Sequence, residues 1–252
     1  MPLKTGHDLS SERIAAGYAA IGAAGIWPEE FYWRVLALAG DLRGRRLAEI
    51  GCGRGGLLAA AAGRGALVHG ADLTASHAAA ARNRAPSAGI VVADVLDGLP
   101  YRTGAFDVVV AMEVIEHLRD PAECFVEARR LLKQGGMLML TVPNATAYAP
   151  FHVLGRLVPG RWLRRKLLPY EHPVNTRQPI DTMYAFGEIL QLVADNGFRA
   201  DAVDGYRHFR WAYGFPVIRT LYTPLAPRVE RWLRGRNSHR FAYHLIVRAR
   251  PV

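Results

Sequence analysis

The feature that most constrains the fold is a glycine-rich turn between two apolar runs, at residues 47–50 and 57–62. The first run predicts a short buried strand, and the second, rich in alanine and leucine, predicts a helix. The glycines of the turn are Gly51, Gly53 and Gly55. Because glycine tolerates positive φ and has no side chain, such a turn at a helix N-terminus lets a ligand approach the backbone closely.

The spacing and surroundings of these glycines narrow the choice of ligand. The spacing differs from the G-x-G-x-x-G pattern of dinucleotide-binding turns. No lysine stands in the turn to meet a phosphate group. The turn therefore predicts a nucleotide-like ligand and disfavours nucleotide hydrolysis.

Apolar runs and helical patterns alternate from residue 45 onward. The runs that predict strands lie at 47–50, 66–71, 90–93, 106–111, 137–142, 198–203 and 241–247. The segments that predict helices lie at 57–62, 75–84, 121–132 and 181–196. We expect Gly135 and Gly136 to end the helix at 121–132, and 241–247 to be an edge strand. Nearly continuous apolar strands separated by helices are typical of a parallel sheet covered on both faces, which predicts an α/β fold.

The chain of 252 residues predicts a single domain with four parts. Residues 1–44 form a helical cap, and residues 45–143 form the ligand-binding core. Two insertions, at 144–180 and 205–239, are too long for ordinary connections and combine aromatic with basic side chains, as in the cluster Arg161–Lys166. We expect the insertions to form a lid or a surface-binding region.

The positive charge is confined to one part of the chain. Residues 1–145 carry 15 Lys or Arg and 15 Asp or Glu, whereas residues 146–252 carry 17 and 7, which accounts for the whole net charge of +10. This asymmetry indicates a basic part that faces an anionic partner, namely a membrane surface, a nucleic acid or an acidic substrate. A basic face that only aids solubility is the alternative.

Composition excludes several protein classes. No apolar run approaches the roughly 18 residues of a membrane span, and residues 1–11 lack the apolar core of a signal peptide. The two cysteines, Cys52 and Cys124, fall in different predicted elements, and two cysteines cannot build a disulfide framework or a structural zinc site. We therefore expect a cytoplasmic protein.

Polar residues follow the predicted strands at their carboxyl ends, where an open parallel sheet binds its ligand. Asp72 follows the second strand, Asp94 follows the third, and Glu113, Glu116 and His117 follow the fourth. Asp72 lies about 20 residues beyond the glycine turn, the distance at which an acid accepts hydrogen bonds from ribose hydroxyls. Each acid taken alone also suits a helix N-cap, but a suitable group follows every one of the first four strands.

In combination these motifs resemble those of the class I S-adenosylmethionine-dependent methyltransferases. The segments that carry the resemblance are 47–55, 70–73, 93–95, 106–109, 113–118 and 131–138. The resemblance implies a doubly wound, mostly parallel sheet of about seven strands, the last of them antiparallel. It also implies methyl transfer as the activity and S-adenosyl-L-methionine as the cofactor.

The resemblance further assigns cofactor-binding roles to a set of residues. They are Glu49, Gly51, Gly53, Gly55, Asp72, Leu73, Asp94 and Val95. The glycines would pack against the methionine part of the cofactor, and Glu49 would orient the turn. Asp72 would hold the ribose hydroxyls, and Asp94 would accept a hydrogen bond from the adenine amino group. A carboxylate-lined pocket with apolar walls also suits the positive charge of the cofactor's sulfonium.

A sharper motif, Glu-x-x-Glu-His, follows the fourth predicted strand. On a helical turn its Glu113, Glu116 and His117 share a face, where two carboxylates and an imidazole suit a divalent metal ion. The motif is similar to that of ubiquinone-biosynthesis-type O-methyltransferases and of small-RNA 3′-end 2′-O-methyltransferases. In the RNA enzymes a further histidine completes a metal site, for which His172 is the candidate in this chain. Many methyltransferases that this chain resembles carry the motif without a catalytic metal, so a structural role for it stays open.

His117 and His172 are also the candidates for a general base that removes a hydroxyl proton as the methyl group arrives. A structural, hydrogen-bonded role is the alternative for each of them. We expect O-methylation of a small or lipid-like acceptor. RNA 2′-O-methylation and a non-catalytic cofactor-binding partner that docks on membrane or protein are the two rivals.

The basic aromatic insertions predict how an acceptor is reached. A lid over the site is the first interpretation. Peripheral contact with an anionic membrane is the second, because apolar side chains alternate with arginines as in interfacial helices. Stacking on single-stranded nucleic acid is the third.

Overall fold

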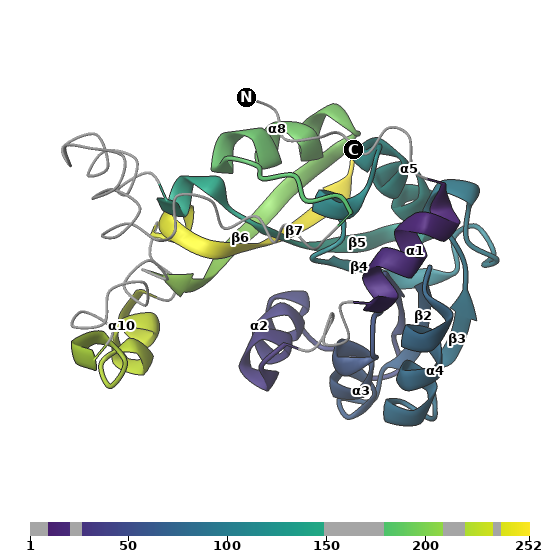
Figure 1. Cartoon of the computed structure of the whole chain (residues 1–252), viewed down its shortest axis with the longest axis horizontal. Helices are drawn as coiled ribbons and strands as arrows, with labels where there is room; N and C mark the ends of the chain where they lie inside the picture. The colour runs from purple at the N-terminus through teal and green to yellow at the C-terminus, as the bar shows by residue number, and fades with distance from the viewer. Residues whose placement is uncertain (1–9, 21–26, 149–178, 209–219, 234–237) are drawn as a thin grey trace.

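The computed structural model describes residues 10–20, 27–148, 179–208, 220–233 and 238–252. Within them seven strands form one sheet in the order β3-β2-β1-β4-β5-β7-β6 (Figure 1). The strands are β1 (Arg46–Ile50), β2 (Leu67–Asp72), β3 (Gly89–Val92), β4 (Phe106–Met112), β5 (Leu132–Pro143), β6 (Phe198–His208) and β7 (Ala242–Pro251). Strands β1 to β5 are parallel, and β7 is antiparallel to both of its neighbours. The prediction of an α/β, mostly parallel sheet with an antiparallel last strand is confirmed.

Helices cover both faces of this sheet. The described helices are α1 (Ser11–Ala20), α2 (Glu29–Ala39), α3 (Gly56–Ala62), α4 (Ala75–Arg84), α5 (Pro121–Leu131), α8 (Phe186–Asp195) and α10 (Ala226–Leu233). Helices α2, α3 and α4 lie on one face, and α5 and α8 lie on the other (Figure 1). Each face has its own apolar core, one around Phe31 and Leu57 and the other around Phe125 and Ile189. The sheet is therefore doubly wound, as expected.

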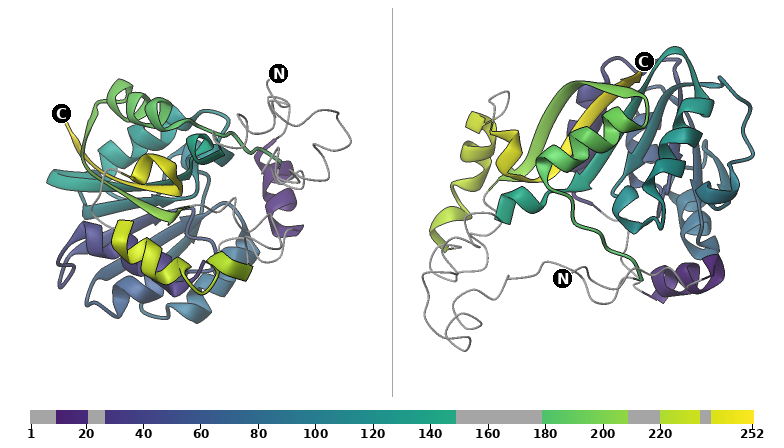
Figure 2. Two further views of the ribbon diagram at one scale, coloured as in Figure 1. Left: turned by 90° about the vertical axis from the view of Figure 1, so that its left-hand side faces the viewer. Right: turned by 90° about the horizontal axis from the view of Figure 1, so that it is seen from above.

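Two helices stand outside these layers. Helix α1 lies by itself in front of the sheet, and α10 lies at the far end, beyond the tips of β6 and β7 (Figures 1 and 2). Ile50 at the end of β1 and residues 108–111 of β4 are apolar and buried, and polar residues such as Glu113 follow in the loops. Among the described helices, none is both long and apolar enough to cross a bilayer.

The glycines Gly135 and Gly136 do not end α5, so that prediction was wrong. Strand β5 begins already at Leu132, which pairs with Phe106 of β4. The register between the two strands then shifts, and Gly135 has φ 74°. The glycine pair therefore forms an irregularity inside the strand, as in a β-bulge.

The expectation of an edge strand at 241–247 was also wrong. Strand β7 lies between β5 and β6, and β6 forms the edge. The consecutive side chains Leu245, Ile246 and Val247 are all buried, which is typical of a strand covered on both faces. The sequence pattern alone did not reveal the order in which the last two strands insert.

The helix predicted at 181–196 begins later, at Phe186. The preceding residues are extended, because the Thr182 N–H donates to the Glu116 carbonyl oxygen and Tyr184 forms a parallel bridge with Asn144. These contacts tie the start of α8 to the turn after β4. Of the insertions expected at 144–180 and 205–239, residues 149–178, 209–219 and 234–237 lie outside the described residues. The described parts include the 3-10 turn η3 (Ala145–Tyr148), the end of β6 and the segment that contains α10.

Candidate active site

The glycine turn after β1 has the backbone that its sequence predicts. Gly51, Gly53 and Gly55 have φ values of 66°, 50° and 74°, a left-handed region that other residues rarely adopt. A Cβ atom on Gly51 would lie 2.6 Å from the Val114 side chain, and one on Gly55 would lie 2.9 Å from Cα of Ala81. The turn therefore needs glycine both for its conformation and for its packing.

Asp72, the last residue of β2, ties this turn to the loop after its own strand. Its Oδ2 accepts from the Gly53 N–H at 2.7 Å, and its Oδ1 accepts from the Thr74 N–H at 2.8 Å. Nδ1 of His77 lies 3.4 Å from Oδ1. Since a carboxylate offers about four acceptor positions, Asp72 keeps capacity for further hydroxyl donors from a ligand.

Glu49 lies in β1, behind the turn, and is buried without lining the cavity described below. Burial raises its pKa well above the usual value, and the nearby charge of Asp72 raises it further. Its Oε2 has no hydrogen-bond partner among the described residues. Burial therefore favours the neutral form of the Glu49 carboxyl group, which lies next to the turn that it was expected to orient.

Asp94, after β3, joins two separate parts of the site. Its Oδ1 accepts from the Leu96 N–H at 3.0 Å and so caps the 3-10 turn η1 (Val95–Asp97). Its Oδ2 accepts from the Ser11 hydroxyl of α1 at 2.6 Å. A second anchor of α1 is the Tyr18 hydroxyl, which donates to the Ile180 carbonyl oxygen at 3.0 Å. Helix α1 is thus fastened over the edge where the parallel strands end.

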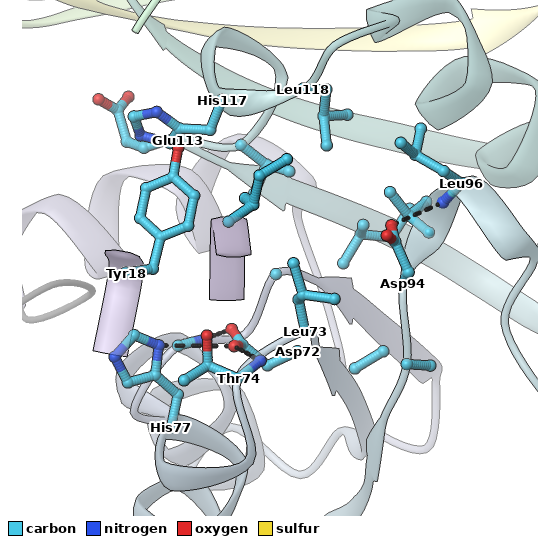
Figure 3. Close-up of a pocket in the computed structure, with 18 of the residues that line it drawn as sticks. Tyr18, Asp72, Leu73, Thr74, His77, Asp94, Leu96, Glu113, His117 and Leu118 are labelled. Atoms are coloured by element: carbon cyan, nitrogen blue, oxygen red, sulfur yellow. Dashed lines mark hydrogen bonds and ion pairs between the residues drawn. The ribbon is translucent and has the colours of Figure 1, made fainter. Parts of the chain in front are cut away.

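One cavity of about 410 Å³ lies between α1 and this edge (Figure 3). Eight of the residues that the sequence analysis singled out line it: Gly51, Gly53, Asp72, Leu73, Asp94, Val95, Glu113 and His117. Tyr18, Glu113 and His117 lie together on one side, and Asp94 and Leu96 lie on another (Figure 3). Glu49, Gly55 and Glu116 do not line the cavity, and His172 lies outside the described residues.

Glu113 directly follows β4 and has a left-handed backbone, with φ 54°. Its Oε1 accepts from the Thr141 hydroxyl at 2.8 Å, and its Oε2 lies 2.9 Å from Nδ1 of His244. All three side chains are buried. A non-glycine residue is held in this conformation only where its surroundings determine it, and such positions cluster at functional sites.

The sequence analysis missed Thr141 and His244. Thr141 lies within an apolar run, and His244 lies in the last strand, 131 positions from Glu113. Only the insertion of β7 beside β5 brings them to Glu113. The one available signal was a polar residue within each of two buried strands.

Glu116 and His117 belong to a short 3-10 turn, η2 (Ile115–His117). Burial raises the pKa of Glu116 well above its usual value, and the charge of Glu113 adds to this. Burial lowers the pKa of His117. Nδ1 of His117 lies 2.9 Å from the Ile180 carbonyl oxygen. Because a carbonyl oxygen only accepts, Nδ1 carries the hydrogen and Nε2 of the neutral ring carries the lone pair.

The described residues do not fit a divalent metal ion. The helical turn begins only after Glu113, so the expectation that Glu113, Glu116 and His117 share a helical face was wrong. Both oxygens of Glu113 already accept hydrogen bonds from other side chains. Within the described part of the chain no three His, Cys, Asp or Glu side chains are arranged to hold a metal.

Comparison of the sequence with known proteins shows which family is similar to this chain. The sequence profile of a methyltransferase domain matches residues 48–140. The ubiquinone biosynthesis O-methyltransferase of Glaesserella parasuis is 35% identical over 176 residues, which cover 67% of this chain and 70% of the relative. The enzyme of the same name from Sodalis glossinidius is 36% identical over 114 residues, or 44% of this chain. The chain spans only 46% of that relative's length.

Solved structures share the fold. The S-adenosylmethionine-dependent methyltransferase of Mesorhizobium loti superposes with a TM-score of 0.58 and 22% identity, covering 88% of this chain and 98% of that one. The sequence match to the Glaesserella enzyme extends over two thirds of both chains. This chain belongs to the class I S-adenosylmethionine-dependent methyltransferases.

Proposed function

We propose that this chain transfers the methyl group of S-adenosyl-L-methionine to an oxygen atom of a small or lipid-like acceptor. The observation that carries the proposal is the cavity under α1. It brings together the glycine turn, Asp72 and Asp94, as a cofactor site requires, with a histidine that suits an acceptor hydroxyl. The names of the relatives, ubiquinone biosynthesis O-methyltransferases, favour oxygen as the methylated atom.

The residues present fit this cofactor. Gly51 and Gly53 leave room for a ligand against the backbone, and Asp72 keeps free acceptor positions for ribose hydroxyls. No lysine in the turn competes for a phosphate, and the walls of the cavity are largely apolar. When bound, the cofactor supplies an electrophilic methyl group on a positively charged sulfur. Carboxylates around a largely apolar cavity stabilise such a cation.

We assign to His117 the role of general base toward the acceptor hydroxyl. Its Nδ1 is fixed by the Ile180 carbonyl oxygen, which directs the lone pair of Nε2 away from that contact. Its lowered pKa favours the neutral ring, which would accept the hydroxyl proton as the acceptor oxygen bonds to the methyl carbon and the bond from that carbon to the cofactor's sulfur breaks. Holding the hydroxyl in line with the methyl group supplies the larger part of the rate enhancement.

Helix α1 covers the cavity, which favours a small acceptor. The main alternative acceptor is the end of an RNA. The test is transfer of a labelled methyl group to a panel of catechols, phenols, quinols and a short RNA. We expect a product with at least one hydroxylated small molecule, and its rate should fall in His117→Ala. Labelling of the RNA alone would overturn the choice of acceptor, and no labelling despite cofactor binding would leave the non-catalytic rival as the better account.

A further inference from the structure

The segment that contains α10 exposes an unusual group of apolar side chains. Leu221 is 66% exposed, Leu225 48%, Trp232 61% and Phe241 46%. The other large apolar side chains that are exposed in the described residues are scattered: Trp33, Leu67, Val92, Val126 and Val252. A gathering of exposed leucine and aromatic side chains on one short segment marks an interaction surface.

The contacts of α10 with the core decide which way it faces. Oε2 of Glu230 lies 3.4 Å from Nη1 of Arg34 and 3.0 Å from Nδ1 of His208. Leu233 is buried on the same side. Leu225, Arg228 and Trp232, at positions i, i+3 and i+7, lie on the opposite side and are exposed. The helix is therefore fixed with an apolar and cationic face outward.

The charges on this surface have one sign. Arg228, Arg231 and Arg240 are exposed, and Glu230 points to the core. The described residues 220–233 and 238–241 contain one acidic residue, Glu230. Apolar side chains that insert while arginines remain at head-group level are typical of interfacial helices on anionic lipid.

The surface lies at the functional edge of the sheet. Strand β6 ends at His208 and the antiparallel strand β7 begins at Ala242. The segment that joins them therefore starts and ends on the same side of the sheet. Pro143, at the carboxyl end of β5, pairs with His244 near the start of β7. This is the edge from which the glycine turn and Glu113 also emerge.

We propose that α10, together with the exposed Leu221, Leu225 and Phe241 beside it, docks the protein on the surface of an anionic lipid bilayer. Charge complementarity selects the partner, and the exposed leucines distinguish a bilayer from RNA, because aliphatic side chains gain little from contact with bases or phosphates. The surface brings the edge that carries the cavity close to the membrane, from which a lipid-like acceptor enters. The docking itself does not depend on the proposed methyl transfer.

The experiment is co-sedimentation of the full chain with vesicles of phosphatidylcholine, with or without phosphatidylglycerol. We expect binding only to the anionic vesicles, with release at high salt. The double variants Leu225→Ser/Trp232→Ser and Arg228→Ser/Arg231→Ser should each bind about tenfold more weakly. Val126→Ser, an exposed apolar position on α5, is the matched control and should bind like the unmodified chain.

Circular dichroism and binding of S-adenosylhomocysteine show whether each variant is folded. Unchanged vesicle binding in both double variants would overturn the assignment to α10. A salt-dependent shift of single-stranded RNA without vesicle binding would replace the membrane by nucleic acid. Vesicle binding without methyl transfer to any acceptor would leave the docking intact and count against the proposed function.

Discussion

Nδ1 of His244 lies 2.9 Å from Oε2 of Glu113, and this contact joins the last strand of the sheet to the residue that follows β4. Both side chains are buried, and Glu113 also lines the cavity. Because the Thr141 hydroxyl holds the other carboxylate oxygen, the Glu113 side chain has one orientation. The site therefore depends on the position of β7, far from every recognisable motif.

Replacing His244 tests this dependence. His244→Phe removes the donor to a buried carboxylate and should lower the free energy of unfolding by about 1–3 kcal/mol. His244→Gln keeps an N–H donor and should retain most of the stability. Urea unfolding at neutral pH measures both variants, and equal losses for Phe and Gln would show that packing matters rather than the hydrogen bond.

Gly55 should not tolerate a side chain. Gly55→Ala adds a Cβ atom 2.9 Å from Cα of Ala81, at a φ of 74°, and should cost more than the 1–2 kcal/mol of left-handed strain. Gly44→Ala is the control, because Gly44 lies in a turn closed by the Arg45 N–H and the Leu42 carbonyl oxygen and has a similar φ of 69° with nothing near its added Cβ. The difference in thermal stability between the two variants isolates the contact with α4, and no difference would contradict its importance.

The Ser11–Asp94 hydrogen bond should hold α1 over the cavity. Ser11→Ala removes the donor at 2.6 Å from Oδ2 and should speed amide exchange in α1 by about fivefold to tenfold. Glu12→Gln changes an exposed neighbour on the same helix and should leave exchange unaltered. Hydrogen exchange followed by mass spectrometry makes the comparison, and protection that survives Ser11→Ala would place the anchor elsewhere.

Glu127 should make the fold sensitive to acid. Burial alone raises its pKa, but hydrogen bonds from Arg130 and from the Leu99 N–H outweigh burial and hold the pKa below the usual value. A pKa that is lower in the folded state means that the stabilisation is present above the unfolded value of about 4.3 and is lost as pH falls through the folded value.

The variant Glu127→Gln should therefore be less stable than the unmodified chain at pH 7, by about 1–3 kcal/mol. The difference should shrink as the pH is lowered below about 4. Urea unfolding across this range measures it, with Glu123→Gln, an exposed acid on the same helix, as the control. A difference that is independent of pH would show that the Glu127 charge is not what stabilises the contact.

The sequence predicted those parts of the site that depend on neighbouring residues. The glycine turn, Asp72 and Asp94 each follow a strand directly, so their place at the carboxyl edge follows from the strand itself. The partners of these groups were not predictable in the same way. Ser11 reaches Asp94 across 83 positions, and His244 reaches Glu113 across 131, so both contacts depend on how distant segments pack.

The turn after β4 shows a second limit of sequence patterns. The spacing of Glu113, Glu116 and His117 suits a shared helical face, but Glu113 has a left-handed backbone and the 3-10 turn begins only at Ile115. The spacing of the motif does not reveal that Thr141 and His244, which lie outside it, contact the Glu113 carboxylate. The same holds for β7, whose buried run fits an inner strand as well as an edge strand.

Calorimetric titration of the full chain with S-adenosylhomocysteine tests the central claim most directly. We expect saturable binding at one site, weakened at least tenfold in Asp72→Asn, because the amide replaces the acceptor of the ribose hydroxyls. Asp97→Asn, an exposed acid in the turn after Asp94, should bind like the unmodified chain. The absence of saturable binding in the folded chain, or equal affinity in Asp72→Asn, would contradict the assignment of the cavity to this cofactor.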